Sequence, residues 1–460
     1  MDISIILAAG EGTRMKSKMP KVLHKVCGKP ILEYVIDASL GAGIEKNIVI
    51  VGHGGDIIKD FFKEEPITFK NQPLGKDAPY GTGFAVMQAI EEIKDEDTVV
   101  ILCGDTPLIT EKSIKLLLDY HKTEGLHGTV LTTLLDDATG YGRIKRDVYG
   151  KVSNIVEEKD ATELEKEIKE INSGVFCFNG KVLRSFLKKL DNNNAQNEYY
   201  ITDIIGILKE EGYSLGAVII EDKNEIHGVN SREQLSFSEK LMKSRINNFH
   251  MREGVTIIDP ENTYIGKNVK IGRDTVIYPG VFLEGDTNIG EDCIIRGNTR
   301  VFNSDIESFV KIEGSVIEDS TVEMGASLGP NAHLRPKSYI GKNVHIGNFV
   351  EVKNARIGNN SKAGHLAYIG DAIVGENVNI GCGVIFANYN GIEKSQTIVG
   401  DNCFIGSNSN LVAPVKIKDW GYVAAGSTIT KEVEEGSLSI ERATQVNIKG
   451  WVERKGLKNK

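Results

Sequence analysis

The sequence lacks the features of cysteine-based scaffolds, of nucleic-acid-binding proteins and of membrane-spanning proteins. Its six cysteines are too few for a disulfide scaffold and form no CxxC-type zinc pattern; they are Cys27, Cys103, Cys177, Cys293, Cys382 and Cys403. Positive charge is not in excess, because 55 basic and 64 acidic side chains give a net charge of −9, whereas nucleic-acid-binding domains are normally basic. No stretch approaches the roughly 20 apolar residues of a membrane span. We therefore expect reduced thiols, no nucleic-acid partner and no membrane partner.

The N-terminus has no features of an export signal. The apolar run Ile5–Ala9 is too short for a signal peptide, and no basic segment precedes it. A hydrophobic fraction of 40% is enough for a real core, and 460 residues suggest two or three domains at about 100–200 residues each. We expect a cytoplasmic protein.

The first half alternates strand-type and helix-type segments. Buried-strand patterns occur at Ile3–Leu7, Asn47–Val51 and Thr98–Leu102, and Pro30–Ser39 has helical spacing. This alternation predicts an α/β domain with a largely parallel sheet. Gly10 and Asp105 lie just past strand ends, which is where such sheets bind ligands.

After Gly254 the period changes to six. Inward-type aliphatic residues recur at Ile265, Ile271, Ile277, Leu283, Ile289, Ile295 and Val301, again at Leu328, Leu334, Ile340, Ile346 and Val352, and again at Val399, Ile405, Leu411, Ile417, Val423 and Ile429. This is the hexapeptide repeat of a parallel β-helix. The rhythm breaks between Ile380 and Val399, which predicts a loop ejected from the stack, and such loops often bind ligands.

A single helix is predicted to join the two halves. Ser231 and Gln234 have the spacing of a capping box at its start, and we expect it to cover Ser231–Met251. The predicted division is therefore a first domain over 1–230, a linker helix over 231–250 and a β-helix domain over 251–460.

The loop after the first strand has the composition of a phosphate site. Gly10 and Gly12 allow a ligand to approach the backbone closely, while Arg14 and Lys21 supply positive charge. The segment is neither a Walker A motif nor a GxGxxG fingerprint. By chemistry alone it is either a phosphate site or an ordinary strand-to-helix turn.

LAAGEGTRM followed by PKVL resembles the signature of sugar-1-phosphate nucleotidylyltransferases. Further segments match in order, namely QPLG at 72, GTG at 81, GD at 104, GYGRI at 140, IVEEKD at 155, NSG at 172 and GVN at 228. With the hexapeptide half, essentially the whole chain is similar to the bacterial bifunctional N-acetylglucosamine-1-phosphate uridylyltransferase/glucosamine-1-phosphate N-acetyltransferases. The resemblance implies a Rossmann-like α/β nucleotidylyltransferase domain followed by a left-handed parallel β-helix.

The resemblance also assigns roles in the first half. It implies a UTP and UDP-sugar site made of Leu7, Ala8, Ala9, Gly10, Lys21, Gln72, Gly81, Thr82, Cys103, Gly104, Asp105, Gly142, Glu157, Asn172 and Asn230, with Asp105 and Asn230 as Mg²⁺ ligands. Cys103 stands where the family usually has tyrosine. A sugar phosphate is already anionic, so its attack on the α-phosphorus of UTP needs positioning and charge neutralisation rather than a base. Arg14, Lys21 and Mg²⁺ would supply them.

In the β-helix half, two cations are one coil apart. Arg335 and Lys353 are 18 residues apart, so they should stack on one face at roughly 5 Å. With no carboxylate evident between them, they are either a phosphate site or two solvated surface cations. The resemblance favours the phosphate site and adds Tyr368 and Asn379 as sugar contacts.

The resemblance makes His365 the general base of acetyl transfer, a role suited to an imidazole pKa, with Glu351 as the candidate to orient its ring. It implies an acetyl-CoA site of Cys382, Asn388, Tyr389, Ser407, Ala425 and Arg442. Cys382 stands where the family often has alanine, and direct transfer is favoured over an acetyl-cysteine.

The implied partners are small molecules: glucosamine 1-phosphate, N-acetylglucosamine 1-phosphate, UTP and acetyl-CoA. The implied assembly is a homotrimer, and the implied product, UDP-N-acetylglucosamine, serves peptidoglycan and lipopolysaccharide synthesis. The residues leave two alternatives open. One is a single-function nucleotidylyltransferase whose β-helix serves only regulation or assembly, and the other is a β-helix that is only a scaffold or interaction module. His365, the two cations and the ejected loop argue against both.

Overall fold

The computed structural model describes residues 1–75 and 78–457. The chain divides into two compact units, Met1–Met242 and Lys243–Lys460, and the division falls inside helix α8, Arg232–Arg252. The domain limits at residues 230 and 250 stay predictions. Among the helices of the described residues, none combines the length and the apolar character that crossing a membrane requires.

The first unit is built on a mixed nine-stranded sheet. Its order is β11-β7-β10-β6-β1-β4-β5, with β8 and β9 attached through β10. Strands β6, β1, β4 and β5 are parallel, as predicted, whereas β10 runs antiparallel between β6 and β7. The strands are β1 Asp2–Ala8, β4 Lys46–Val51, β5 Ile67–Asn71, β6 Thr98–Cys103, β7 Gly128–Leu134, β8 Arg143–Arg146, β9 Val152–Val156, β10 Glu170–Asn179 and β11 Leu215–Ile219; β2 Lys25–Val26 and β3 Lys29–Pro30 form a separate pair.

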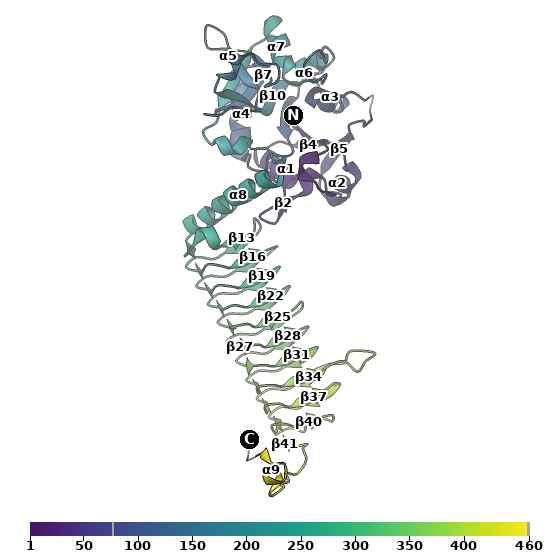
Figure 1. The fold of residues 1–460 in the computed structure, drawn as a ribbon, viewed down its shortest axis with the longest axis vertical. Coiled ribbons are helices and arrows are strands. Elements are labelled where there is room, and N and C mark those ends of the chain that lie inside the picture. The colour runs from purple at the N-terminus through teal and green to yellow at the C-terminus, as the bar shows by residue number, and fades with distance from the viewer. Residues whose placement is uncertain (76–77, 458–460) are drawn as a thin grey trace. The chain divides into compact units, whose positions relative to one another are not determined.

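Helices pack on both faces of this sheet (Figure 1). Alternate residues of β1 enter two separate cores, with Ile3 and Ile5 in one and Ile6 and Ala8 in the other, because successive side chains of a strand point to opposite faces. Helices α1, α2 and α4 contribute to the core of Ile6, and α3, α6 and α7 to the core of Ile3. The helices are α1 Ile31–Gly41, α2 Gly55–Phe61, α3 Thr82–Met87, α4 Glu111–Thr123, α5 Glu163–Lys166, α6 Gly180–Leu187 and α7 Asp203–Glu210.

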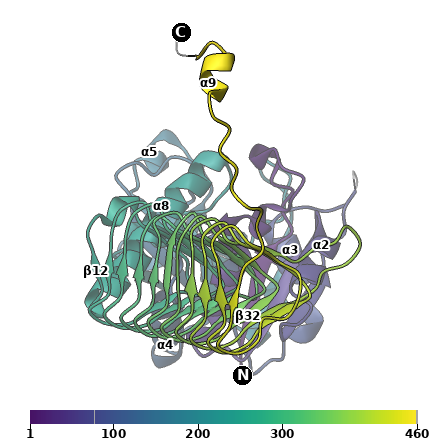
Figure 2. The same cartoon turned by 90° about the horizontal axis from the view of Figure 1, so that it is seen from below.

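The second unit is a left-handed parallel β-helix, as predicted. Each coil adds one short strand to each of three parallel sheets, and Figure 2 shows successive coils lying over one another. The first sheet contains β12 Thr256–Ile257, β15 Val276–Ile277, β18 Ile294–Ile295, β21 Lys311–Ile312, β24 Ser327–Leu328, β27 His345–Asn348, β30 Lys362–His365, β33 Asn379–Ile380, β36 Phe404–Ile405, β39 Tyr422–Val423 and β41 Leu438–Ser439. The second contains β13 Tyr264–Ile265, β16 Phe282–Glu284, β19 Arg300–Phe302, β22 Val316–Glu318, β25 His333–Leu334, β28 Glu351–Lys353, β31 Tyr368–Gly370, β34 Ile385–Ala387, β37 Asn410–Val412 and β40 Thr428–Ile429. The third contains β14 Lys270–Ile271, β17 Asn288–Ile289, β20 Asp305–Ile306, β23 Thr321–Val322, β26 Tyr339–Ile340, β29 Arg356–Ile357, β32 Ala372–Val374, β35 Thr397–Val399 and β38 Val415–Ile417.

The predicted ejected loop leaves the stack between β34 and β35 (Figure 1). Within it, Tyr389 and Lys394 form an isolated antiparallel bridge. The coil resumes because Val374 of β32 still pairs with Val399 of β35. Residues 440–457 are exposed, and in this described part of the C-terminal segment the one helix is the short α9, Trp451–Arg454.

We expect Ile346→Ala to lower the free energy of unfolding by about 2–5 kcal/mol, the usual cost of truncating a core isoleucine. Ile346 is fully buried and pairs with Leu328 and Ala363 in the neighbouring coils. Urea unfolding of the full chain measures the change. Ile373→Ala is the control, because that side chain is 43% exposed, and an equal cost for both would contradict the stacked core.

Candidate active sites

The predicted phosphate loop begins at the carboxyl edge of β1. Leu7 pairs with Cys103 of β6, and the N–H of Gly104 donates to the Leu7 carbonyl at 2.9 Å. Ala8 and Ala9 are buried, Gly10 is exposed, and a Cβ added to Gly10 would meet no atom within 4 Å. The loop and the Gly104–Asp105 turn therefore lie side by side, as parallel strands require.

Three predicted site residues meet beside this loop. The ammonium of Lys21 donates to Asp105 Oδ2 at 2.6 Å and to Asn230 Oδ1 at 2.9 Å. The backbone fixes the same arrangement, because the N–H of Val229 donates to the carbonyl of Asp105 at 2.8 Å. One cation thus bridges a carboxylate and an amide oxygen from segments that are distant in sequence.

Three further residues of the predicted UTP and UDP-sugar site lie together: Gly142 just before β8, Glu157 just after β9 and Asn172 on β10. The N–H of Asn172 donates to the Gly142 carbonyl at 2.8 Å, and a Cβ on Gly142 would lie 3.2 Å from Glu157 Oε2. Burial raises the pKa of Glu157, although a hydrogen bond from the Thr202 hydroxyl opposes this. The β10–β7 register shifts just after Asn172, and such bulges re-aim side chains at functional sites.

Cys103 lies between Asp105 and the segment of β10 that carries Asn172. Burial, reinforced by the Asp105 carboxylate, raises the pKa of its thiol to about 12, so the thiol stays protonated at neutral pH. Its Sγ donates to the Gly174 carbonyl at 3.6 Å, inside the bulge that follows Asn172. The cysteine is thus a packing and hydrogen-bonding residue beside Asp105.

Gln72, Gly81 and Thr82 of the predicted site lie at the end of β5 and the start of α3. Gln72 is buried, and its N–H donates to the Val51 carbonyl at 2.8 Å. Gly81 has φ +120°, and a Cβ there would lie 2.4 Å from the Tyr199 carbonyl oxygen, so only glycine fits. Thr82 Oγ1 accepts from the Ile201 N–H at 3.1 Å.

Arg14 is exposed in the turn Thr13–Met15, and within the described residues its side chain has no hydrogen bond or ion pair. The same loop lines a cavity of about 560 Å³, to which Lys16 and Lys18 contribute. Sequence reasoning passed over these two lysines, although the run from Arg14 to Lys21 contains four cations and no acid.

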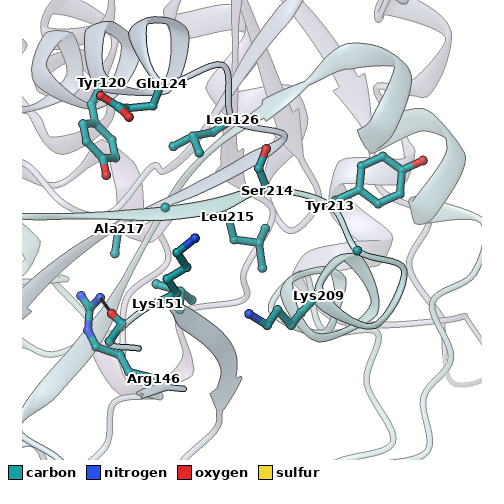
Figure 3. Close-up of a pocket in the computed structure, with 14 residues that line it drawn as sticks. Tyr120, Glu124, Leu126, Arg146, Lys151, Lys209, Tyr213, Ser214, Leu215 and Ala217 are labelled. Carbon is teal, nitrogen blue, oxygen red and sulfur yellow. Dashed lines mark hydrogen bonds between the residues drawn. The ribbon is translucent and has the colours of Figure 1, made fainter. Parts of the chain in front are cut away.

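A second cavity, of about 510 Å³, lies beside β11 and the β8–β9 hairpin (Figure 3). None of the predicted site residues lines it. Two of its three cations are already paired, Arg146 with Glu170 and Lys209 with Asp147. It is therefore not part of either candidate site.

The predicted acetyl-CoA residues form a column along the β-helix. His365, Cys382, Ser407 and Ala425 each stand two residues after an inward-facing residue of the first sheet, and those inward residues pair from coil to coil. The guanidinium of Arg442 donates to the Ala425 carbonyl at 2.9 Å. The chain thus aligns His365 with Cys382, Ser407 and Ala425, and Arg442 contacts the last of them.

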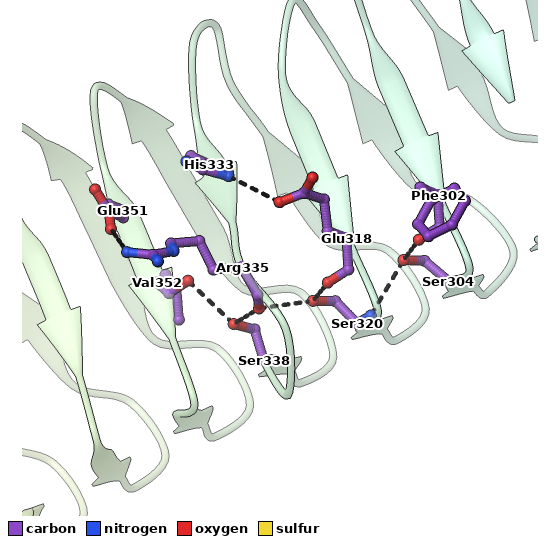
Figure 4. Close-up of polar contacts among 9 residues, drawn as sticks. All are labelled: Phe302, Ser304, Glu318, Ser320, His333, Arg335, Ser338, Glu351 and Val352. Atoms are coloured by element: carbon purple, nitrogen blue, oxygen red, sulfur yellow. Dashed lines mark hydrogen bonds and ion pairs between the residues drawn. The ribbon is translucent and has the colours of Figure 1, made fainter. Parts of the chain in front are cut away.

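The imidazole of His365 is exposed, and its orientation differs from the prediction. Its Nδ1 lies 2.7 Å from Asn348 Oδ1, one coil away. Because an amide oxygen only accepts, Nδ1 carries the proton and Nε2 is left as the acceptor. The expectation that Glu351 orients this ring is wrong: Glu351 belongs to the second sheet, where its carboxylate accepts from Arg335 Nη1 at 2.9 Å (Figure 4).

Arg335 and Lys353 stack on one face, as predicted, because His333–Leu334 pairs in register with Glu351–Val352. The expectation of no carboxylate beside them is wrong, because Glu351 pairs with Arg335 and raises its pKa. The Arg335 carbonyl also accepts from the Ser320 and Ser338 hydroxyls, at 3.1 and 2.6 Å (Figure 4). These bonds fix the turn that presents the guanidinium.

The ejected loop adds a cation that sequence reasoning missed. The positive charge of Lys394, with a smaller contribution from Arg335, lowers the pKa of Lys353, which places the two ammonium groups near each other. The signal was available, because Lys394 belongs to the loop that breaks the repeat. Three cations therefore gather at one point of the β-helix.

The remaining predicted residues lie on the neighbouring strands and in the ejected loop. Asn388 is buried; it donates to the Asp371 carboxylate and to the Tyr368 hydroxyl, the latter at 3.4 Å. Tyr389 is exposed in the loop, and Asn379 is exposed on β33. The loop is thereby tied to the coil that carries Tyr368.

Comparisons with known proteins agree with this architecture. Residues 3–226 match the nucleotidyl transferase family model, 268–303 match the bacterial transferase hexapeptide model, and 316–417 match the GMPPB C-terminal domain. The chain is 54% identical over 457 residues to the bifunctional protein GlmU of Clostridioides difficile, a match that covers 99% of this chain and 98% of the relative. The chain belongs to the bifunctional GlmU family. A GlmU of Alkaliphilus metalliredigens is 53% identical and one of Clostridium novyi 50% identical, and each match covers 99% of both chains.

Proposed function

We propose that this protein makes UDP-N-acetylglucosamine by two reactions. The second unit acetylates glucosamine 1-phosphate with acetyl-CoA, and the first unit joins the product to UMP from UTP and releases pyrophosphate. The observation that carries the proposal is that full-length GlmU relatives match over 99% of the chain. The chain also keeps a Lys21–Asp105–Asn230 constellation in one unit and a His365 column in the other.

In the first unit, Asp105 and Asn230 would hold Mg²⁺. Their oxygens converge on one cation, Lys21 Nζ, and a carboxylate with an amide oxygen suits this hard ion, which keeps waters and phosphates as its other ligands. Among the described residues no group of three or more His, Cys, Asp or Glu side chains could hold a metal. When bound, Mg²⁺ would neutralise triphosphate charge, while Lys21 and Arg14 contact phosphates.

In the second unit, His365 Nε2 would take a proton from the glucosamine amine as its nitrogen attacks the acetyl carbonyl. The amide bond forms, the carbon–sulfur bond breaks, and coenzyme A leaves as the thiol after accepting a proton. Asn348 holds the imidazole in the tautomer that can act as base. The acetyl-CoA would be contacted by Cys382, Ser407, Ala425, Asn388, Tyr389 and Arg442, and we propose that the chain assembles as a homotrimer.

The test is to supply purified protein with acetyl-CoA and glucosamine 1-phosphate and to follow thiol release, and then to add UTP with Mg²⁺ and follow pyrophosphate. Thiol release followed by pyrophosphate release supports both activities. Pyrophosphate from added N-acetylglucosamine 1-phosphate, without thiol release, would leave a single-function nucleotidylyltransferase.

We expect Lys394→Ala to raise the KM for glucosamine 1-phosphate by about tenfold, which corresponds to about 1.4 kcal/mol of lost phosphate binding. The charge of Lys394 lowers the pKa of Lys353, and two neighbouring ammonium groups favour an anion between them. The KM for acetyl-CoA should stay unchanged. Lys342→Ala is the control, since that lysine is exposed on a turn of the same β-helix; equal changes in both variants would contradict the assignment.

A further inference from the structure

The first turn of α8 contacts the uridylyl-transfer residues in a way that its sequence pattern does not predict. Ser231 and Gln234 have capping-box spacing, and Ser231 Oγ does accept from the Gln234 N–H at 3.3 Å. In a capping box the Gln234 side chain would return to the Ser231 N–H. Instead, Gln234 Oε1 accepts from the N–H of Asn230 at 2.8 Å.

The same turn is attached to the phosphate loop. Arg232 Nε donates to the Met15 carbonyl at 3.2 Å, and Arg232 Nη1 lies 3.2 Å from His24 Nδ1. His24 follows Lys21–Leu23, and its N–H donates to the Lys21 carbonyl at 3.2 Å. The turn therefore has fixed contacts with the segment that carries Lys21.

We propose that Gln234 is a positioning residue for uridylyl transfer, which holds the backbone of Asn230 so that its amide oxygen meets Lys21 and Asp105. This rests on the proposed function of the first unit. Two hydrogen bonds hold the backbone at Asn230. The N–H of Asn230 donates to Gln234, and the N–H of the preceding residue, Val229, donates to the Asp105 carbonyl. A displacement of about 1 Å in such a group can cost about 10²-fold in rate.

The test compares variants of this turn in the full-length protein. Gln234→Leu removes the acceptor and should lower the kcat of uridylyl transfer at least tenfold, while Gln234→Glu keeps an acceptor oxygen and should restore most of it. Ser231→Ala removes only the helix cap, so its melting temperature should fall while its kcat stays near wild type. Acetyl transfer should be unchanged in all three.

A double-mutant cycle separates positioning from general destabilisation. If Gln234 acts through Asn230, Gln234→Leu should have no further effect on kcat in an Asn230→Ala background. A full additional loss in that background, or a Gln234→Leu protein as active as Ser231→Ala, would overturn the inference. Wild-type protein without uridylyl transfer would overturn the proposed function instead.

Discussion

Replacing Asp105 by asparagine should lower uridylyl transfer by about 10²–10³-fold, the usual cost of losing one preorganised electrostatic group. The carboxylate pairs with Lys21 at 2.6 Å and is the only acidic group of the proposed Mg²⁺ pair. Asparagine keeps the shape but removes the charge that pairs with Lys21 and would hold Mg²⁺. Pyrophosphate release from UTP and N-acetylglucosamine 1-phosphate measures the loss.

Two comparisons make the Asp105 result specific. Asp2→Asn breaks another Lys–Asp pair of the same unit, the one with Lys122, also at 2.6 Å, and should leave uridylyl transfer intact. Acetyl transfer should be unchanged in Asp105→Asn, because each unit buries its own core. Loss of both activities in a folded protein would contradict the separation.

Replacing His365 by alanine should lower acetyl transfer by about 10²–10⁴-fold, the range for a general base. Its Nδ1 is held by Asn348, which leaves Nε2 free to take the proton. Thiol release from acetyl-CoA is the readout, and uridylyl transfer should keep its wild-type rate.

His345→Ala is the matched control for His365. This histidine also belongs to the first sheet of the β-helix, and its Nδ1 is also held by a polar neighbour, Ser327 Oγ at 2.9 Å. It should keep most acetyl transfer. If both alanine variants lose activity equally, the effect comes from the β-helix and not from a base at His365.

Much of the fold could be predicted because its signals are periodic and local. The six-residue rhythm predicted the β-helix and the place of the ejected loop, since each inward residue must stack on its neighbours. The same rhythm predicted that Arg335 and Lys353 stack, because one coil returns to the same face. The antiparallel β10 was not predicted, because strand direction depends on the path of the chain between strands.

The predictions that were wrong or incomplete concern which side chains meet on the faces of the β-helix. Glu351 and His365 are close in sequence, yet one belongs to the second sheet and the other to the first. Lys394 was missed because its contact with Lys353 depends on how the ejected loop folds back. Spacing places a residue on a coil, but it does not say which neighbour its side chain meets.

The sequence by itself determined the two architectures and the family, because repeats and ordered motifs depend only on residue type and spacing, whereas the phosphate loop and the base at His365 stay predictions. Only the tertiary structure decided which side chains meet. It brings Lys21 to Asp105 and Asn230. It also places Asn348, rather than Glu351, at the His365 ring, and Gln234 at the N–H of Asn230. The physical reason is the short range of these side-chain contacts. Hydrogen bonds act over about 3 Å, and the segments that they join are brought together only when the sheet and the coils have formed.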